Sequence, residues 1–292
     1  MRVIMVFMRH KLLLALVKLS ERKVSRLQIV KQAFLLRQHL SSDYARRFYE
    51  FLPYDWGPFS FTLYHDLQKM ADSGLLTFPS DKTIEATEHS SSVSKSLEPR
   101  LRAELYSFWE AYGNYRVGQL LDLVYENYPW YASRSKRGRQ NGLEETAKCE
   151  VYTIGYEGMQ LDGFLNVLLA SGIQTIVDVR KNAVSRVYGF HGSTLASVAD
   201  RLGIKYRHVP ELGIPSAWRT DPCSGLELDT LFSKYRGEVI PLVEGTIDNV
   251  ASIVCQKPSV LMCLESNPAK CHRSVLAEYV SRVSGLSISD LR

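Results

Sequence analysis

From residue 150 onward, short apolar runs alternate with amphipathic stretches long enough to form helices. The runs predicted to be strands are EVYTIGY, IQTIVDV, IKYRHV and SVLMCLE. The stretches predicted to be helices are LDGFLNVLLASG, STLASVADRLG, residues 226–256 and SVLAEYVSRVSG. Continuous apolar strands separated by helices are typical of a parallel sheet that helices cover on both faces. We therefore predict an α/β domain in this half of the chain.

The first half of the chain has mostly helical periodicity. Ser25 is a predicted N-cap, because apolar positions recur at helical spacing directly after it. A second helix is predicted after Ser60 and ends at Gly74, and the following piece KTIEAT is predicted to be extended. With a first helix predicted near the start of the chain, the order is helix, helix, capped helix and then a short β segment, which is the order of a winged helix. We predict a mainly helical, winged-helix-like domain.

The segment between the two patterns is polar and has no periodicity. We predict a linker over residues 136–149, between the winged-helix-like domain (1–135) and a Rossmann-like α/β domain (150–292). Residues 1–148 contain 22 Lys and Arg against 16 Asp and Glu, a net charge of +6, whereas residues 149–292 carry −1. The basic half is therefore the predicted contact for a polyanion.

The overall composition is that of a globular protein. Hydrophobic residues make up 45% of the chain and charged residues 23%, and no apolar run is long enough to cross a membrane. The five cysteines, an odd number scattered along the chain, do not resemble a secreted disulfide framework. We expect a cytoplasmic protein with no membrane partner.

Ionisable side chains follow each predicted strand of the second half. Because the carboxyl ends of parallel strands meet at one edge of a sheet, these side chains are predicted to line a single ligand or active site. They are Tyr156 and Glu157 after the first strand, Asp178, Arg180, Arg186 and His191 after the second, Glu211 and Arg219 after the third, and Cys263, Glu265, Cys271, His272 and Arg273 after the fourth.

Longer segments of both halves resemble known families. The second half contains, in order, YTIGYEG, DVRKNAVSRVYGF, IKYRHVPELGIP and LMCLESNPAKCHRSVLAEYV. Together these resemble the DUF488 family, a domain of unknown function, over residues 151–285, with Ala183 or Val184 where the family usually has a proline. The resemblance implies an α/β fold and a polar site at the strand ends, and no established reaction. Through YDWGPFS, DLQKMADSGLL and LLDLVYENYPWY, residues 9–132 resemble the winged-helix-like Panacea (SocA-type antitoxin) domain.

The segment CLESNPAKCHRS, residues 263–274, allows three interpretations. Cys263, Cys271 and His272 are candidate zinc ligands, although C-x-x-C spacing is absent and the adjacent Cys271 and His272 are expected to point in different directions. Cys263 is a candidate nucleophile, because the strand–Cys–loop–Arg layout resembles rhodaneses and cysteine phosphatases. Cys271 is the other candidate, because a helix start and the neighbouring His272 or Arg273 would lower its pKa. The ten positions from Cys263 to Arg273 exceed the tighter loop of those enzymes. The third interpretation is an anion site, in which the helix start and Arg273 hold a phosphate.

The anion site is our preferred hypothesis from the sequence. The predicted phosphate-binding residues are Arg180, Arg186, Arg273 and His272. The predicted catalytic residues are Asp178, Glu265 and Tyr156. The two carboxylates would act as acid and base or bind Mg²⁺, the candidate cofactor, and no metal bound by the cysteines is predicted. The competing interpretation is that Asp178–Arg180 or Glu265–Arg273 form internal ion pairs.

The resulting hypothesis is an enzyme, a hydrolase or transferase that acts on a nucleic acid or a nucleotide. The predicted nucleic-acid contacts of the basic half are Arg22, Lys23, Arg26 and Lys31. One alternative is a non-enzymatic DNA-binding regulator whose α/β domain senses a phosphorylated ligand. Another is a module that docks a partner protein. A sensor would need the arginines but not both Asp178 and Glu265.

Overall fold

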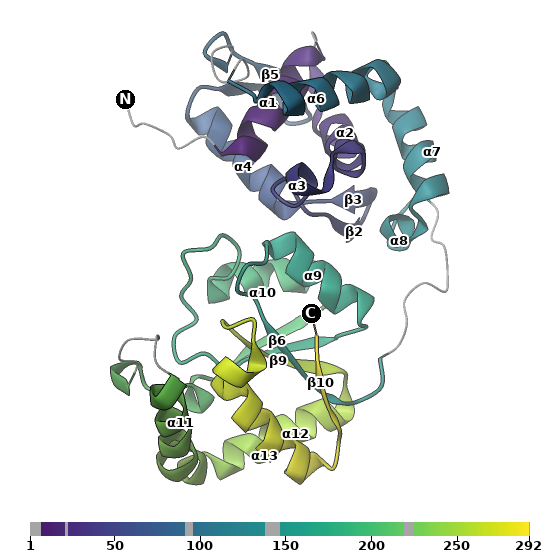
Figure 1. Ribbon diagram of the computed structural model, residues 1–292. Helices are drawn as coiled ribbons and strands as arrows, with labels where there is room; N and C mark the ends of the chain where they lie inside the picture. The colour runs from purple at the N-terminus through teal and green to yellow at the C-terminus, as the bar shows by residue number, and fades with distance from the viewer. Residues whose placement is uncertain (1–6, 21–22, 91–95, 138–146, 219–224, 292) are drawn as a thin grey trace. The chain divides into compact units, whose positions relative to one another are not determined.

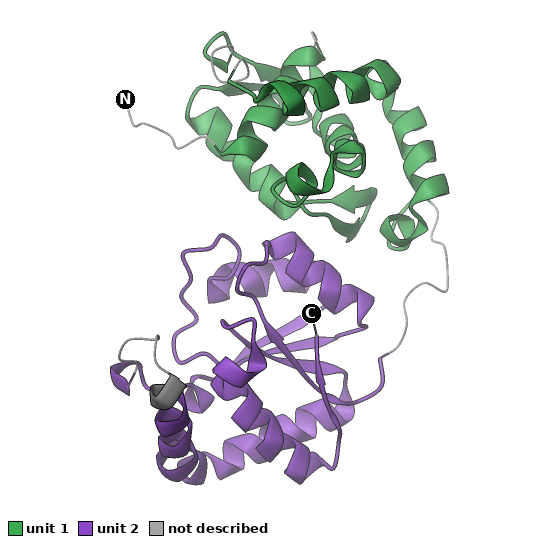
Figure 2. Cartoon of the chain, viewed as in Figure 1, with its two compact units in different colours: residues 1–143 green, residues 144–292 purple. Residues whose placement is uncertain are grey.

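The computed structural model contains two compact units, residues 1–143 (unit 1) and residues 144–292 (unit 2) (Figure 2). The structure describes residues 7–20, 23–90, 96–137, 147–218 and 225–291, except the side chains of 225–227. Each unit has its own hydrophobic core. Within the described residues, no helix has both the length and the apolar character needed to cross a membrane.

Unit 1 is mainly helical and contains two small antiparallel sheets (Figure 1). Its helices are α1 (Met8–Leu19), α2 (Arg26–His39), α3 (Ser42–Ala45), α4 (Phe61–Asp72), α6 (Pro99–Tyr112), α7 (Val117–Asn127) and α8 (Pro129–Ala132). Its strands are β1 (Val24–Ser25), β2 (Leu52–Tyr54), β3 (Gly57–Phe59), β4 (Leu76–Ser80) and β5 (Thr83–Ala86). One sheet has the order β1-β5-β4, and β2 pairs with β3 in the other.

Two helices of unit 1 begin at the predicted serine caps. The Ser25 Oγ accepts a hydrogen bond from the backbone N–H of Gln28 (3.0 Å) at the start of α2. The Ser60 Oγ accepts one from the backbone N–H of Leu63 (3.1 Å) at the start of α4. Each hydroxyl satisfies an N–H group that has no partner inside its own helix. Both predicted helix starts are confirmed.

Lys31 lies within α2, and its side chain is buried (1% exposed). Its Nζ donates a hydrogen bond to the Pro58 carbonyl oxygen on β3 (2.6 Å). Burial lowers the pKa of Lys31 to about 7, because an ammonium ion loses its hydration inside the protein. The structure thus differs from the sequence prediction that Lys31 contacts nucleic acid, since a buried amine does not face a phosphate at the surface.

Unit 2 alternates strands and helices. Its strands are β6 (Val151–Gly155), β7 (Thr175–Asp178), β8 (Lys205–His208), β9 (Ser259–Cys263) and β10 (Ile288–Asp290). Its longer helices are α9 (Leu161–Ala170), α10 (Gly192–Arg201), α11 (Gly225–Lys234), α12 (Glu244–Gln256) and α13 (His272–Ser284). Short helical turns are η1 (Pro210–Leu212), η2 (Ser216–Trp218), η3 (Tyr235–Val239), η4 (Ile240–Leu242) and η5 (Pro268–Lys270).

The five strands of unit 2 form one parallel sheet in the order β10-β6-β9-β7-β8. Helices α9 and α10 cover one face, and α12 and α13 cover the other (Figure 1). The predicted α/β architecture with a parallel sheet is therefore confirmed. The C-terminal strand β10 was not among the predicted strands.

The neighbouring strands β6 and β9 send the chain to opposite faces of the sheet. The chain leaves β6 for α9 on one face and leaves β9 for α13 on the other (Figure 1). In open α/β sheets, ligands bind outside the carboxyl ends of strands at such a switch point. The ends of these two strands lie side by side, because Gly155 pairs with Cys263 in the parallel register.

We expect Lys31→Met to change how the stability of unit 1 depends on pH. The pKa of Lys31 is about 7 in the folded chain and ordinarily 10.5, so between these values the unfolded chain binds a proton that the folded chain does not. This group therefore costs stability as the pH falls from 10.5 toward 7, with no further change below that range. From pH 9 to pH 7, the unfolding free energy of the wild type should fall by about 2 kcal/mol relative to Lys31→Met.

Urea unfolding followed by tryptophan fluorescence measures this difference, since three of the four tryptophans lie in unit 1: Trp56, Trp109 and Trp130. Lys69→Met, at an exposed position of α4, is the matched control and should show no such pH dependence. A difference between wild type and Lys31→Met that stays constant from pH 7 to pH 9 would show that the buried amine keeps its ordinary pKa.

Candidate functional site

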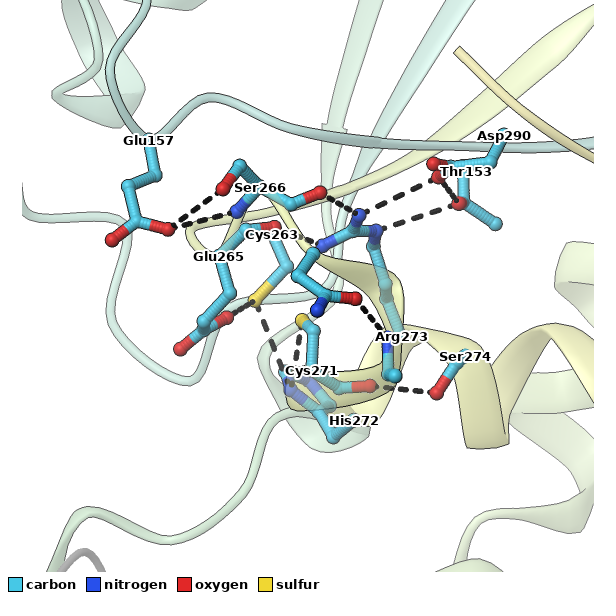
Figure 3. Close-up of polar contacts among 12 residues, drawn as sticks. Thr153, Glu157, Cys263, Glu265, Ser266, Cys271, His272, Arg273, Ser274 and Asp290 are labelled. Atoms are coloured by element: carbon cyan, nitrogen blue, oxygen red, sulfur yellow. Dashed lines mark hydrogen bonds and ion pairs between the residues drawn. The ribbon is translucent and has the colours of Figure 1, made fainter. Parts of the chain in front are cut away.

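The candidate site lies at the carboxyl end of β9, the middle strand of the sheet, where residues 264–271 lead into α13 (Figure 3). Cys271 is the N-cap of α13 and has extended backbone angles (φ −129°, ψ 135°), and His272 is the first helical residue. The Cys271 Sγ lies 4.0 Å from His272 Nδ1. The extended residue therefore brings the two adjacent side chains together, contrary to the sequence-based expectation that they diverge.

Cys263, Cys271 and His272 form a compact group, which we call the Cys–His cluster. The Cys263 Sγ lies 3.8 Å from His272 Nδ1. Both sulfur atoms and this nitrogen lie within 4.8 Å of one another. All three residues are buried, with 0%, 1% and 2% exposure. Two thiols and an imidazole nitrogen thus share one small volume inside unit 2.

The orientation of the His272 ring determines which nitrogen meets the sulfur atoms. Its Nε2 lies 3.1 Å from the Val179 carbonyl oxygen. Because a carbonyl oxygen only accepts hydrogen bonds, Nε2 carries a proton and donates it, and in the neutral ring Nδ1 keeps its lone pair. The Tyr235 ring packs edge-on against the imidazole, with centroids 5.5 Å apart. The lone pair of His272 therefore faces the two cysteines.

The two thiols of the cluster differ in proton affinity. Burial alone would raise the pKa of Cys271, but its hydrogen bonds, with Cys263 first and then with His272, lower that pKa well below the usual thiol value. The hydrogen bond to Cys271, together with burial, raises the pKa of Cys263 well above it. Of the two, Cys271 is therefore the more acidic thiol and Cys263 the less acidic one.

Glu265 is the partly exposed member of the site. The Cys263 thiol donates a hydrogen bond to its Oε2 (3.4 Å). Its side chain is half-buried, and Figure 3 shows the carboxylate beside the sulfur of Cys263. A carboxylate that reaches solvent thus lies against a buried pair of thiols. Of the two predicted catalytic carboxylates, Glu265 is the one with access to solvent.

Arg273 is fully buried, and its guanidinium holds the loop after β9. Its Nη1 donates to the Glu265 carbonyl oxygen, and its Nη2 donates to the Ser266 carbonyl oxygen (3.1 Å). The same Nη2 lies 3.4 Å from Asp290 Oδ1 on β10, and Nε lies 3.4 Å from Thr153 Oγ1 on β6. Phosphate binding by Arg273 stays a prediction, and it would require phosphate to replace these internal acceptors.

The end of β6 packs directly against the same loop. A Cβ at Gly155 would overlap the carbonyl group of Glu265, so only glycine fits at this position. The Glu157 carboxylate accepts hydrogen bonds from the backbone N–H and the hydroxyl of Ser266, both 3.0 Å long. These bonds, the backbone bond first, lower the pKa of Glu157. The loops that follow β6 and β9 are thus joined in one rigid edge.

Asp178 and Arg180 form a buried, bidentate ion pair. The Asp178 Oδ1 accepts from Arg180 Nε (2.8 Å), and Oδ2 accepts from Nη2 (2.5 Å) and from the Tyr206 hydroxyl (2.6 Å). Burial would lower the pKa of Arg180, but hydrogen bonding and the charge of Asp178 raise it above the ordinary value. The interpretation of Asp178 and Arg180 as an internal ion pair is confirmed.

Tyr156 belongs to the same buried network. Its hydroxyl oxygen accepts a hydrogen bond from Arg180 Nη1 (3.0 Å), and its ring stacks on Phe190 with centroids 4.2 Å apart. The Phe190 carbonyl oxygen accepts a second bond from the same Nη1 (2.9 Å). Tyr156 and Asp178 therefore support the sheet edge from inside, and Asp178 lies outside the Cys–His cluster.

The remaining predicted contacts do not gather at this site. Arg186 and His191 are exposed on the segment between β7 and α10, and Glu211 is exposed in η1. In unit 1, Lys23 is exposed, while the half-buried Arg26 lies over the Phe78 ring at 4.2 Å. Two predicted residues, Arg22 and Arg219, lie outside the described part of the chain.

Several supporting groups were not identified from the sequence. The Val179 carbonyl oxygen orients His272, yet a backbone acceptor leaves no side-chain pattern. Ser266 and Asp290 are ordinary polar residues, and their roles depend on partners distant in sequence. The tight contact between the loops that follow β6 and β9 is indicated in the sequence by the glycine and the glutamate of GYEG, which lie next to a predicted strand end.

We expect Arg273→Lys to destabilise unit 2 by about 3 kcal/mol, because an ammonium group replaces only part of the planar guanidinium contacts and leaves buried acceptors without donors. Hydrogen exchange of the β6 and β9 amides measures this loss separately from unit 1. Arg282→Lys, at an exposed position of the same helix, should change stability by less than about 0.5 kcal/mol. A stable Arg273→Lys variant that has lost bound phosphate would instead support the anion interpretation.

One family model matches part of unit 2. No curated protein and no solved structure matches the chain. The resemblance of residues 9–132 to the Panacea domain stays a prediction. Residues 160–280 match the family model described as domain of unknown function DUF488, and this match contains the whole Cys–His cluster.

Proposed function

We propose that unit 2 is a hydrolase or transferase that acts on a nucleotide or a nucleic acid, with Glu265 as its acid–base group. The observation that carries this proposal is the position of the Glu265 carboxylate. It is half-buried, contacts the Cys263 thiol, and follows the middle strand of a parallel sheet at a switch point. Ionisable groups with unusual environments in such positions are typical of reaction sites.

Glu265 is the better candidate of the two predicted carboxylates for chemical reasons. Both oxygens of Asp178 accept hydrogen bonds from Arg180, and the residue is fully buried. A substrate would have to displace these contacts and would leave the buried guanidinium of Arg180 without its ion-pair partner. Glu265 is instead half-buried, and its Oε2 accepts a hydrogen bond from the Cys263 thiol (3.4 Å). The proposal therefore rests on one carboxylate and involves no Mg²⁺ held by a carboxylate pair.

The proposed reaction is a displacement at an electrophilic centre of the substrate. Glu265 takes a proton from the attacking group, which is water in a hydrolase or a hydroxyl or amine in a transferase. The oxygen or nitrogen of that group bonds to the electrophilic atom, and the bond to the leaving group breaks. The leaving group then receives the proton from Glu265, so that protons and charge balance over the cycle.

The substrate class follows from charge. Residues 1–148 carry a net charge of +6, which favours a polyanion. The order of α2, α4 and the β4–β5 hairpin, with β1 paired to β5, supports a winged-helix-like unit 1. Lys23 is its exposed predicted contact. We expect the cytoplasm as the compartment, because the four described cysteines are free thiols.

We expect Glu265→Gln to lower turnover by about 100- to 10,000-fold with little change in fold, because the amide cannot carry the transferred proton. The measurement is release of product from a panel of nucleotides, single-stranded and double-stranded nucleic acids, incubated with the full chain. Glu278→Gln, at an exposed position of α13, is the matched control and should keep full activity.

Two results would contradict the proposed function. Equal turnover of the Glu265→Gln and Glu278→Gln variants would remove Glu265 from the chemistry. Binding of a phosphorylated ligand with no turnover of any substrate would favour the regulator. If no member of the panel binds or reacts, the protein-docking alternative is supported.

A further inference from the structure

We propose that Cys263, Cys271 and His272 bind one zinc ion and leave its fourth coordination position open beside Glu265. This inference deepens the proposed function, because it supplies the group that activates the attacking water. The activation of water by zinc depends on the proposed function. Zinc binding itself does not, because it is measured without any substrate.

The distances within the Cys–His cluster are close to those of a tetrahedral site. Zinc binds thiolate sulfur at about 2.3 Å and imidazole nitrogen at about 2.0–2.1 Å, so tetrahedral ligands lie about 3.5–3.8 Å apart. The Cys263 Sγ and the Cys271 Sγ lie 3.8 Å and 4.0 Å from His272 Nδ1. A contraction of a few tenths of an ångström would therefore complete the first coordination shell.

The imidazole already has the form that a metal ligand requires. Its Nε2 donates to the Val179 carbonyl oxygen (3.1 Å), which leaves the Nδ1 lone pair directed at the two sulfurs. In metal sites, the second ring nitrogen of a histidine ligand almost always makes such a hydrogen bond, which sets the tautomer and the ring orientation. The ring of Tyr235 packs edge-on against the imidazole and limits its rotation.

The donor atoms select the metal. Two thiolates and one imidazole are soft and borderline ligands, which suit zinc, whereas Mg²⁺ prefers carboxylate and carbonyl oxygens. The cluster is buried and lies on the loop that Arg273 and Glu157 hold in place. Such support keeps the ligands in position before the ion arrives, so little ordering accompanies binding.

The fourth position would face Glu265. Sites with three protein ligands and one open position are typical of catalytic zinc, which lowers the pKa of a bound water. The Glu265 Oε2 lies 3.4 Å from Cys263 Sγ. Glu265 is not a member of the Cys–His cluster, whose ligand atoms all lie within 4.8 Å of one another. If zinc is bound there, it would supply an activated water, and Glu265 is placed to take up the proton of that water.

The competing use of the same two cysteines is a disulfide. Both sulfur atoms lie within 4.8 Å of each other, so an oxidant of the disulfide or peroxide class would remove two electrons and two protons and join them. An oxidised pair cannot bind zinc. The experiment below therefore starts from the reduced chain and distinguishes the two outcomes.

The test uses the full chain, reduced, freed of metal with a chelator and kept without oxygen. Titration with Co²⁺ should saturate at one ion per chain and give the thiolate charge-transfer and tetrahedral d–d absorption bands. Zn²⁺ should then displace Co²⁺ stoichiometrically. Cys263→Ser and Cys271→Ser should each lower the affinity by more than about 100-fold.

The matched control is Cys255→Ser, because Cys255 is an exposed thiol outside the cluster and its replacement should leave the metal stoichiometry unchanged. Cys271→Ser should remain folded, since serine is a favourable N-cap for α13, and circular dichroism checks this. If Cys271→Ser is folded and binds the metal as tightly as the wild type, the inference is overturned. The same holds if the reduced wild type binds no metal or only re-forms a disulfide.

Glu265→Gln separates this inference from the proposed function. We expect it to keep one metal ion per chain, with affinity changed by less than about 10-fold, while turnover falls. Metal binding with no effect of Glu265→Gln on turnover would leave the zinc site standing and remove the proposed function. Loss of turnover in Glu265→Gln, in a chain that binds no metal, would do the reverse.

Discussion

The buried guanidinium of Arg273 is the interaction on which the functional edge of unit 2 depends. A charge inside a protein is tolerated only when hydrogen-bond acceptors surround it, and Arg273 finds them on three segments that are distant in sequence. The carbonyl oxygens of Glu265 and Ser266, the hydroxyl of Thr153 and the carboxylate of Asp290 contact it. The path of the loop after β9, and with it the direction of the Glu265 side chain, follows from this requirement.

The two arginines at this edge are engaged by internal acceptors. Arg180 neutralises Asp178, and Arg273 organises carbonyl oxygens. The Cys–His cluster places two sulfurs and one imidazole nitrogen beside the carboxylate of Glu265. These donor atoms favour a soft metal ion over the hard cation that a pair of carboxylates would bind. The sequence shows which residues follow each strand, but it does not show which of them are buried.

The sequence predicts the sheet of unit 2 well, because continuous apolar strands separated by helices have few other solutions. It does not predict β10, because Ile288–Asp290 is short, lies at the edge of the sheet and lacks an apolar run. The burial of Lys31 could not be predicted either, because the residues on both sides of it in α2 are also buried and no polar face of the helix distinguishes buried from exposed positions. The convergence of Cys271 and His272 depends on one extended residue at the helix start, which residue types do not specify. Glu265 was selected from the sequence because a carboxylate that follows an apolar strand is predicted to lie at the carboxyl edge of the sheet.

The contact between Arg273 and Asp290 joins the loop after β9 to a strand that follows it in the chain. The segment 263–273 holds both thiols and the imidazole, and it emerges from the ribosome before β10. Until β10 pairs with β6, Thr153 and Asp290 do not form their hydrogen bond (2.5 Å), and the guanidinium lacks these partners. We therefore expect the loop after β9 to lack a fixed conformation until β10 docks. Until then, its two thiols should be accessible to oxidants and to metal ions. If the Cys–His cluster binds zinc as proposed, a chain with β10 undocked would exchange the ion faster than the closed fold.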